Sequence, residues 1–176
     1  GDQSGYSVSL SSDGKRVAIG AHKNDDNGDN NDNRGHVRIY EWNDPSWTQL
    51  GEDIDGEGPS DHSGYSVSLS NNGQYLAVGA LGPENWTLTN PPTHRGYVKI
   101  YQISPSGGLQ DISYPNGIVD YTGIDNYGIS VSLNGDATST QISVAIGSYN
   151  NNGNGHVKIY QYDGNGSSWT QLGSID

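Results

Sequence analysis

The sequence predicts an all-β chain of three four-stranded antiparallel propeller-type blades, and three observations support this fold class. Short runs rich in Val, Ile, Leu and Tyr alternate with segments rich in Gly, Asn, Asp and Ser, as in strands joined by turns. The same runs recur three times in the same order, which indicates a repeat architecture. Each repeat of about 60 residues contains four such runs, the number of strands in a propeller blade.

The first run of each repeat follows the pattern Gly-x-Ser-Val-Ser-Leu, at residues 5–10, 64–69 and 128–133. Successive side chains of a strand point to opposite faces, so we expect Tyr6, Val8 and Leu10 on one face and Ser7 and Ser9 on the other. A sheet with one bulky face and one small face can stack on a copy of itself. We therefore expect the blades to stabilise one another rather than to fold independently.

Three further runs complete the repeats. They lie at residues 17–21, 76–80 and 144–148, then at 35–40, 96–101 and 155–160, and last at 47–51 and 169–173 with a weaker copy at 108–112. The pairs Asp13-Gly14 and Asn72-Gly73 separate the first two runs and predict tight type I′ hairpins, which need positive φ. We expect one repeat domain over residues 1–176, with repeats at about 1–59, 60–123 and 124–176.

These runs resemble FG-GAP repeats, the repeat family of integrin-α-type β-propellers. The resemblance rests on the Gly-Tyr-Ser-Val-Ser strand, the Ala-Ile-Gly-Ala or Ala-Val-Gly-Ala strand and the Gly-His-Val-Arg-Ile-Tyr type of strand, and it covers essentially the whole chain. It implies a β-propeller segment or repeat array. The family's repeats often carry an Asp-x-Asp-x-Asp-Gly calcium loop between the first two strands. Here the turns at residues 11–15 and 70–74 are short and poor in carboxylates, so those calcium sites are not expected.

The chain is acidic, with 20 Asp and Glu residues against 8 Lys and Arg residues and a formal net charge of -12. Such a surface repels phosphate backbones and anionic membranes, so we expect no nucleic-acid partner. No apolar run is long enough for a membrane-spanning helix, and no membrane insertion is expected. Cysteine is absent, which excludes disulfides and thiolate metal sites.

Two Asn-x-Ser/Thr sequons begin at Asn85 and Asn165, in turn-rich segments where an attached glycan would be exposed. Together with the acidic surface, these predicted glycosylation sites favour a secreted protein that acts outside the cell or at the cell surface. Trp86 lies inside the first sequon, in an insertion that the other repeats lack. Because an indole can stack on a sugar ring, Trp86 is the candidate ligand-contact residue.

The candidate metal ligands are Asp25, Asn27, Asp29 and Asp32, in the loop between the second and third runs of the first repeat. The first three have the i, i+2, i+4 spacing of calcium-loop oxygens. However, Asn30 replaces the Gly of the sharp turn, and no bidentate Glu follows at the twelfth position. A solvated polar loop without calcium is the alternative, and no other cofactor is expected.

No residue pattern indicates catalysis. The Gly-Tyr-Ser-Val-Ser run lacks the strand-to-helix turn and the final Gly of a nucleophile elbow, and it recurs three times, whereas a catalytic serine is needed once. His36 and His156 share a repeat position with Tyr97, which predicts a position on a strand surface, and the chain has no His-x-His or His-Glu-x-x-His spacing for zinc. We therefore expect the chain not to be an enzyme.

These observations predict a non-catalytic extracellular module with a structural or adhesive role. Three blades are fewer than the four to eight of closed propellers, so we expect exposed blade faces that bind other copies of the chain or neighbouring repeats, in a ring or a filament. The alternative is a lectin-like propeller whose partners are glycans or cell-surface proteins. In that case the loops between strands would form the contact surface.

Overall fold

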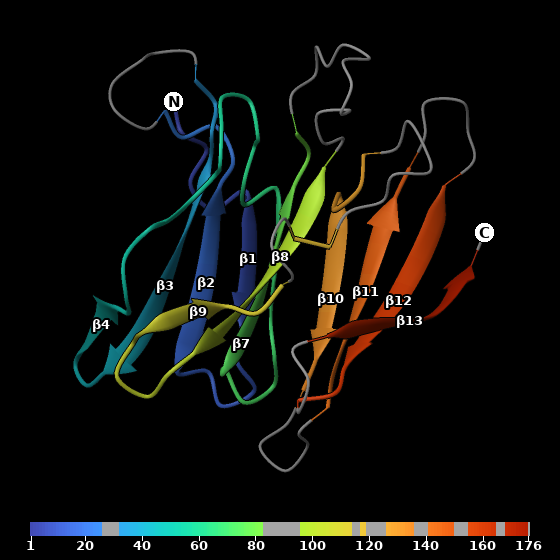
Figure 1. The fold of residues 1–176 in the computed structure, drawn as a ribbon. Coiled ribbons are helices and arrows are strands. Elements are labelled where there is room, and N and C mark those ends of the chain that lie inside the picture. Colours follow the sequence, from blue (N-terminus) through green and yellow to red (C-terminus); the bar gives the residue numbers. More distant parts are fainter. Residues whose placement is uncertain are drawn as a thin grey trace.

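The computed structural model describes residues 1–25, 32–82, 96–113, 117–118, 126–135, 141–149, 155–164 and 168–175. Within these residues the chain forms thirteen β-strands and no helix, which confirms the predicted all-β class. The strands form three antiparallel sheets, one for each repeat, and the sheets stand side by side (Figure 1). We call them blades 1, 2 and 3 in chain order.

The strands of each blade follow one another in sequence and in space, as in a meander. Blade 1 contains β1 (Ser7–Leu10), β2 (Arg16–Ala21), β3 (His36–Asn43), β4 (Ser46–Gln49) and β5 (Ile54–Asp55). Blade 2 contains β6 (Ser66–Leu69), β7 (Tyr75–Ala80), β8 (Tyr97–Ile103) and β9 (Leu109–Asp111). Blade 3 contains β10 (Ser130–Asn134), β11 (Ile142–Ser148), β12 (His156–Tyr162) and β13 (Trp169–Ile175).

The fourth strand differs most among the blades. In blade 3, β13 is continuous, although its register with β12 shifts at one point. In blade 1 the equivalent chain is divided into β4 and β5, which both pair with β3. In blade 2, β9 is followed by a single bridge between Ile118 and Val98. Each blade nevertheless places an isoleucine opposite the first valine of its third strand, so the outer edge closes at the same repeat position.

The hairpin between the first two strands forms as predicted, but its turn is not of type I′. The Gly14 N–H donates to the Ser11 carbonyl oxygen at 3.0 Å, and Gly14 has a φ of 70°. Asp13 is not among the residues with positive φ, whereas type I′ needs positive φ at both central residues. The Asp13 carboxylate accepts from the Ser11 hydroxyl at 2.7 Å and from the Lys15 N–H at 2.9 Å, and these hydrogen bonds stabilise the observed turn.

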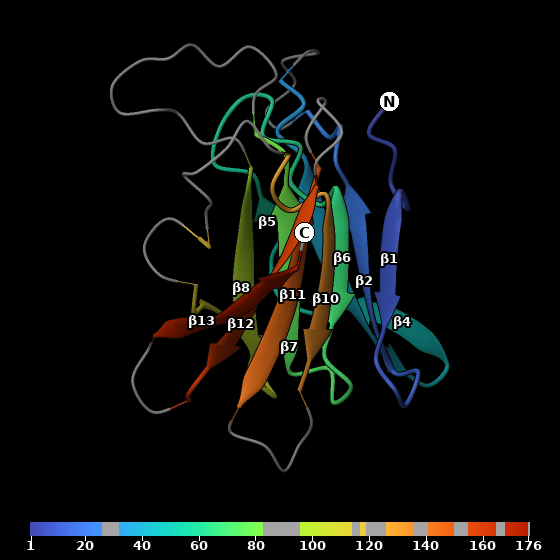
Figure 2. The same ribbon diagram turned by 90° about the vertical axis from the view of Figure 1, so that its right-hand side faces the viewer.

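Two hydrophobic cores lie between the blades rather than inside any one of them. The first joins Val37 and Ile39 of blade 1 to Leu76 and Val78 of blade 2. The second joins blades 2 and 3 in the same way. The first strands β1, β6 and β10 lie in a row, and β6 contacts both of the others (Figure 2). Each blade therefore depends on its neighbour for burial, as expected from the alternation in the sequence.

Candidate functional site

The junctions between blades are built from two serines of each first strand. At the junction of blades 1 and 2, the Ser7 hydroxyl donates to the Gly64 carbonyl oxygen at 2.7 Å. The Ser9 hydroxyl oxygen accepts from the Leu69 N–H at 2.8 Å. The serines of the small-residue face therefore bind the backbone of the following blade, where their short side chains let two strands approach closely.

The junction of blades 2 and 3 repeats this arrangement. The Ser66 hydroxyl donates to the Gly128 carbonyl oxygen at 2.7 Å, and the Ser68 hydroxyl oxygen accepts from the Leu133 N–H at 2.9 Å. The same donor and acceptor positions thus recur one repeat later with nearly identical distances. The counterparts in blade 3 are Ser130 and Ser132, which are both exposed.

A glycine opposite the first serine makes this approach possible. Gly20 pairs with Ser7 across the hairpin, and a Cβ atom at Gly20 would lie 2.2 Å from the Gly64 carbonyl oxygen of the next blade. A Cβ atom at Gly79 would lie 2.1 Å from the Gly128 carbonyl oxygen. A Cβ atom added at Gly147 would lie 2.3 Å from the hydroxyl oxygen of Ser130, which belongs to the same blade. The nearest atoms to it all belong to Ser130.

Each blade has two different faces, which we name by the residues that they carry. The front face carries the bulky residues of the first strand, such as Val67 in blade 2. The back face carries the serines of the first strand and the first valine of the third strand, such as Val37 in blade 1. In both junctions the back face of one blade packs against the front face of the next.

The front face of blade 1 is exposed. Val8 and Leu10 hold the repeat positions of Val67 and Leu69, which are buried in the first core. Val8 is 63% exposed, whereas Val67 is 8% exposed. Trp42, at the position of the buried Ile103, is also exposed. Among the described residues, no strand covers these side chains.

The back face of blade 3 is exposed in the same manner. Ile175 is 63% exposed, whereas Ile54, at the equivalent position of blade 1, is 6% exposed. Val157 and Leu172 are also among the exposed large hydrophobic residues. Val37, the counterpart of Val157, is fully buried. The described part of the chain therefore presents one unmatched front face and one unmatched back face.

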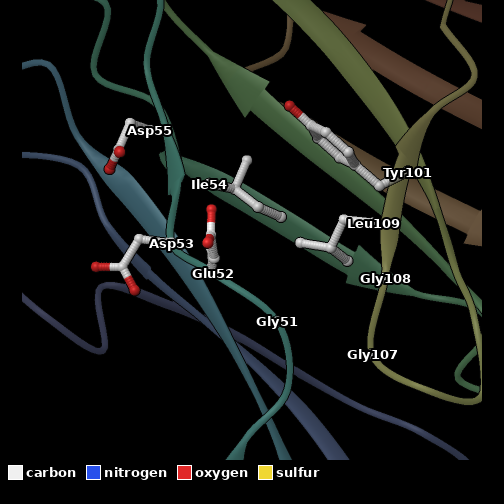
Figure 3. A pocket seen from close by; sticks show the side chains of 9 residues that line it. All are labelled: Gly51, Glu52, Asp53, Ile54, Asp55, Tyr101, Gly107, Gly108 and Leu109. Carbon is white, nitrogen blue, oxygen red and sulfur yellow. The ribbon is translucent and has the colours of Figure 1, made fainter.

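A pocket of ≈ 430 Å³ lies at the outer rim of the junction between blades 1 and 2, where the segment joining β4 to β5 faces the β8–β9 hairpin. The side chains of Ile54, Tyr101 and Leu109 point toward one another within it, while Asp53 and Asp55 point to the other side of their strand (Figure 3). Burial, followed by the nearby Asp111 carboxylate, raises the pKa of Tyr101 above its usual range. Its hydroxyl group is therefore protonated at neutral pH.

Asp53 and Asp55 approach His36 on the opposite side of that strand, and ligand atoms of all three lie within 4.8 Å of one another. The Arg38 guanidinium, however, binds Asp53 with both Nε and Nη2, at 2.9 and 2.7 Å. This hydrogen bonding lowers the pKa of Asp53. A cation would have to displace Arg38, so the arrangement fits a salt bridge better than a metal centre.

The histidines differ from their prediction. His36 and Tyr97 are buried, so their shared repeat position is not a strand surface position in blades 1 and 2. The Tyr97 hydroxyl binds Asp61 in the segment that joins blades 1 and 2. His22 and His62 were not connected by any sequence signal, yet their rings lie 6.0 Å apart. The Nδ1 atoms of both rings are buried and lack a hydrogen-bond partner among the described residues.

Two of the four predicted calcium ligands can be placed. The Asp25 carboxylate accepts from the Asn33 N–H at 2.9 Å, and Asp32 forms an ion pair with Arg34 at 3.1 Å. Asn27 and Asp29 lie outside the described residues. The calcium site therefore stays a prediction.

The predicted glycosylation sites Asn85 and Asn165 and the candidate contact residue Trp86 also lie outside the described residues. Trp169, by contrast, packs on the second core, and its indole N–H donates to the Ile112 carbonyl oxygen at 3.1 Å. No helix in the described part of the chain is long and apolar enough to cross a bilayer.

Comparisons with known proteins agree with this fold. A family model described as FG-GAP repeat matches residues 1–40. No curated protein matches the chain in sequence. Among solved structures, a candidate 6-phosphogluconolactonase from Bacteroides uniformis is similar, with 16% identity and a TM-score of 0.53, covering 96% of this chain and 39% of that chain. A GH32 β-fructofuranosidase from Bombyx mori has 14% identity and a TM-score of 0.51, covering 97% of this chain and 35% of that one.

These structures correct one prediction. The chain was expected not to be an enzyme, yet both similar structures are described as enzymes. The expectation was wrong. It inferred a non-catalytic protein from a repeated strand pattern that contains no catalytic motif, but a similar arrangement of blades also occurs in enzymes. At this identity the similarity concerns the fold alone and assigns no reaction to the chain.

The chain spans little more than a third of the length of the two solved structures. Its β1, β2 and the start of β3 fall within residues 1–40, and the same strands return in blades 2 and 3. The resemblance to FG-GAP repeats is therefore confirmed at residues 1–40, which match a model of that repeat and lie within the first of three propeller-type blades.

Proposed function

We propose that this chain is a structural or adhesive module of an extracellular assembly, which it joins through the free face at each end of its row of blades. The FG-GAP match supports a propeller module. The two sequons and the acidic composition support a place outside the cell. The binding partners on this proposal are neighbouring repeats or other copies of the chain.

The observation that carries the proposal is the contrast between equivalent positions. The front face of blade 1 and the back face of blade 3 expose apolar side chains that are buried wherever a second blade is present. Contiguous exposed apolar surface on a soluble protein marks an interaction site. Because each of these surfaces lies on a single sheet, a partner blade can cover it without rearrangement of the chain.

The proposal is tested by measuring association before and after a charge is placed on one free face. Leu10 is exposed, so Leu10→Asp should leave the monomer folded. In an assembly the new carboxylate would be buried against apolar side chains, at a cost of several kcal/mol. We expect sedimentation velocity to show association of the unaltered chain and its loss in Leu10→Asp.

Gln110→Asp is the matched control, because Gln110 is exposed on β9, away from both free faces, and gains the same charge. Circular dichroism should show that both variants keep the β-sheet signal. A chain that stays monomeric at all concentrations up to the millimolar range, or an equal effect of the two variants, would contradict the proposal.

The second candidate function is glycan or protein binding, which is favoured by the pocket between β5 and the β8–β9 hairpin. It combines an aromatic side chain, Tyr101, with the carboxylate of Glu52 at an opening between two blades. Sugar-binding sites combine aromatic surface with such hydrogen-bond acceptors. The loop that contains Trp86 is a separate contact candidate for the same function.

A glycan array separates these two contact candidates. On the pocket hypothesis, Glu52→Gln should weaken binding to the recognised glycans, and Asp44→Asn, at an exposed hairpin tip, should not. Trp86→Ala addresses the loop in the same assay. If neither Glu52→Gln nor Trp86→Ala alters the array pattern, neither residue contacts a glycan, and the hypothesis of glycan binding at these two places is wrong.

A further inference from the structure

We infer that the pocket between β5 and the β8–β9 hairpin binds the indole side chain of a tryptophan in a basic segment of a partner polypeptide. This inference rests on the second candidate function, binding at that pocket, and names the chemical class of the ligand. Its basis is a comparison of the two junctions inside the chain, because the junction of blades 2 and 3 contains an indole of the chain itself.

The fourth strand of the middle repeat differs from the other two at its first position opposite the third strand. Trp47 in blade 1, Leu109 in blade 2 and Trp169 in blade 3 pair with the same repeat position of that strand. At the junction of blades 2 and 3, Trp169 packs on the second core. At the junction of blades 1 and 2, the shorter side chain of Leu109 lines the pocket. The pocket therefore lies where the repeat carries leucine in place of tryptophan.

A hydrogen-bond acceptor for an indole N–H is available at both junctions. The Trp169 N–H donates to the Ile112 carbonyl oxygen of the preceding blade at 3.1 Å. Leu50 holds the position of Ile112 in blade 1, because the N–H of each donates to the equivalent isoleucine carbonyl of its third strand. Leu50 directly precedes Gly51, which lines the pocket. A buried indole N–H requires such a partner, and the Leu50 carbonyl oxygen is placed to accept from a bound indole.

The lining of the pocket suits a flat apolar ring. Ile54, Tyr101 and Leu109 point toward one another across it, and three glycines contribute only backbone (Figure 3). The volume of ≈ 430 Å³ lies within the range of ligand-binding pockets. Tyr101 offers an aromatic surface, and aromatic rings attract one another in offset or edge-to-face geometry. Such a lining offers few partners to the hydroxyl groups of a sugar and suits a ring with a single N–H donor.

The charge around the pocket favours a basic partner segment. The exposed Glu52 carboxylate lies at its opening. Asp53 is neutralised by the Arg38 guanidinium at 2.7 Å, so Glu52 is the carboxylate that faces a ligand. The chain as a whole has a net charge of -12. Lysine or arginine beside the bound tryptophan would meet this negative field, which steers association and sets its salt dependence.

NMR with the blocked peptide acetyl-Lys-Trp-Lys-amide tests the site on the unaltered chain. The control peptide has alanine in place of tryptophan. We expect a dissociation constant of about 1 mM or below for the tryptophan peptide and at least about 10-fold weaker binding of the control. The largest shifts should fall on the backbone N–H groups of Gly51, Gly107 and Gly108, which line the pocket. No saturable shift up to about 10 mM peptide, or the largest shifts elsewhere, would overturn the inference.

Leu109→Trp tests the pocket by filling it from within the chain. The variant gives the first junction the indole that Trp169 supplies at the second, so it should weaken binding of the tryptophan peptide at least about 10-fold and raise the urea midpoint. Gln110→Trp is the matched control, because it adds the same side chain at an exposed neighbouring position on the opposite face of β9. Equal peptide binding by the two variants would show that the ligand lies elsewhere. If Leu109→Trp does not fold, the shifts measured on the unaltered chain still decide the site.

Glu52→Lys tests the role of charge. It should weaken binding of acetyl-Lys-Trp-Lys-amide about 3-fold or more and leave binding of uncharged N-acetyltryptophanamide unchanged. An equal effect on both ligands would contradict the preference for a basic segment. Binding of N-acetyltryptophanamide without binding of the peptide would contradict a polypeptide partner and indicate a small aromatic ligand.

Failure of this inference and failure of the proposed function are distinguishable. A glycan-array signal that is lost in Glu52→Gln, without peptide binding, would overturn the indole ligand and leave the second candidate function standing. Association through the free faces is measured by sedimentation of the chain without peptide, and its outcome does not depend on the pocket.

Discussion

Replacing Gly79 by alanine should break the junction between blades 2 and 3 without altering the strand that carries it. The added Cβ would lie 2.1 Å from the Gly128 carbonyl oxygen and 2.4 Å from the Ser66 hydroxyl oxygen. The hydroxyl can rotate away, but the carbonyl belongs to the backbone of the next blade. The two blades would therefore have to separate by roughly 1 Å, which also weakens the dispersion contacts of the core between them.

The loss of stability in Gly79→Ala is the sum of two effects, a lost hydrogen bond and overpacking at the junction. Without the hydrogen bond from Ser66 to Gly128 the folded state loses about 1 kcal/mol. Overpacking of a rigid junction costs about 1–3 kcal/mol more. We therefore expect Gly79→Ala to lower the free energy of unfolding by about 2–4 kcal/mol, which would move a urea midpoint by roughly 1–2 M.

Urea denaturation followed by circular dichroism measures this effect, with Gly147→Ala as the matched variant. Gly147 lies at the same repeat position, but an added Cβ there meets no atom of a following blade. At a concentration low enough to keep the chain monomeric, Gly147→Ala should change the midpoint little. If the two variants lose equal stability, the destabilisation comes from the strand itself and not from the contact with the next blade, and our explanation of the junction is wrong.

Three other predictions test the packing and the buried polar groups. Burial, followed by the neighbouring charge of His62, lowers the pKa of His22 below its usual value of 6.5, so the unfolded state binds the proton first. Stability measured by chemical denaturation should therefore fall as the pH drops below 6.5, and His22→Gln should flatten that slope. Val67→Ala should cost about 1.5 kcal/mol and Val8→Ala less than about 0.5 kcal/mol in a urea titration, because only Val67 is buried. Tyr97→Phe should cost about 1–2 kcal/mol in thermal unfolding, because the Tyr97 hydroxyl donates to Asp61 at 3.0 Å in a buried position, and an unchanged melting temperature would count against that role.

The sequence was informative wherever a pattern repeated. The alternation of Val8 with Ser7 and Ser9 predicted the two faces of the first strand, because side-chain direction in a strand depends only on position. It also predicted that blades stack on one another. The hydrogen bonds from these serines to the next blade were not predicted, since no local pattern reveals which backbone atoms a stacked sheet will bring to a hydroxyl group.

Other features depend on contacts between residues distant in sequence. His36 was predicted on a strand surface, but it is buried and lies close to Asp53 and Asp55 of the same blade. His22 and His62 come together only because the ends of β2 and the segment before β6 meet at one junction. The Asp13-Gly14 pair was typical of a type I′ turn, yet hydrogen bonds to the Asp13 carboxylate selected another turn. Such competition among local conformations is decided by the folded surroundings.

The pairing of a serine with a glycine across each hairpin also bears on how proteins of this kind can lengthen. Each pair, Ser7 with Gly20 and Ser66 with Gly79, belongs to one repeat and contacts the backbone of the next repeat. A repeat of this kind therefore has one face that binds the preceding blade and one face that binds the following blade. Duplication of a stretch of DNA that encodes one repeat would add a blade that already fits its neighbours on both sides. The number of blades is thus free to change while the chemistry of the contact stays the same.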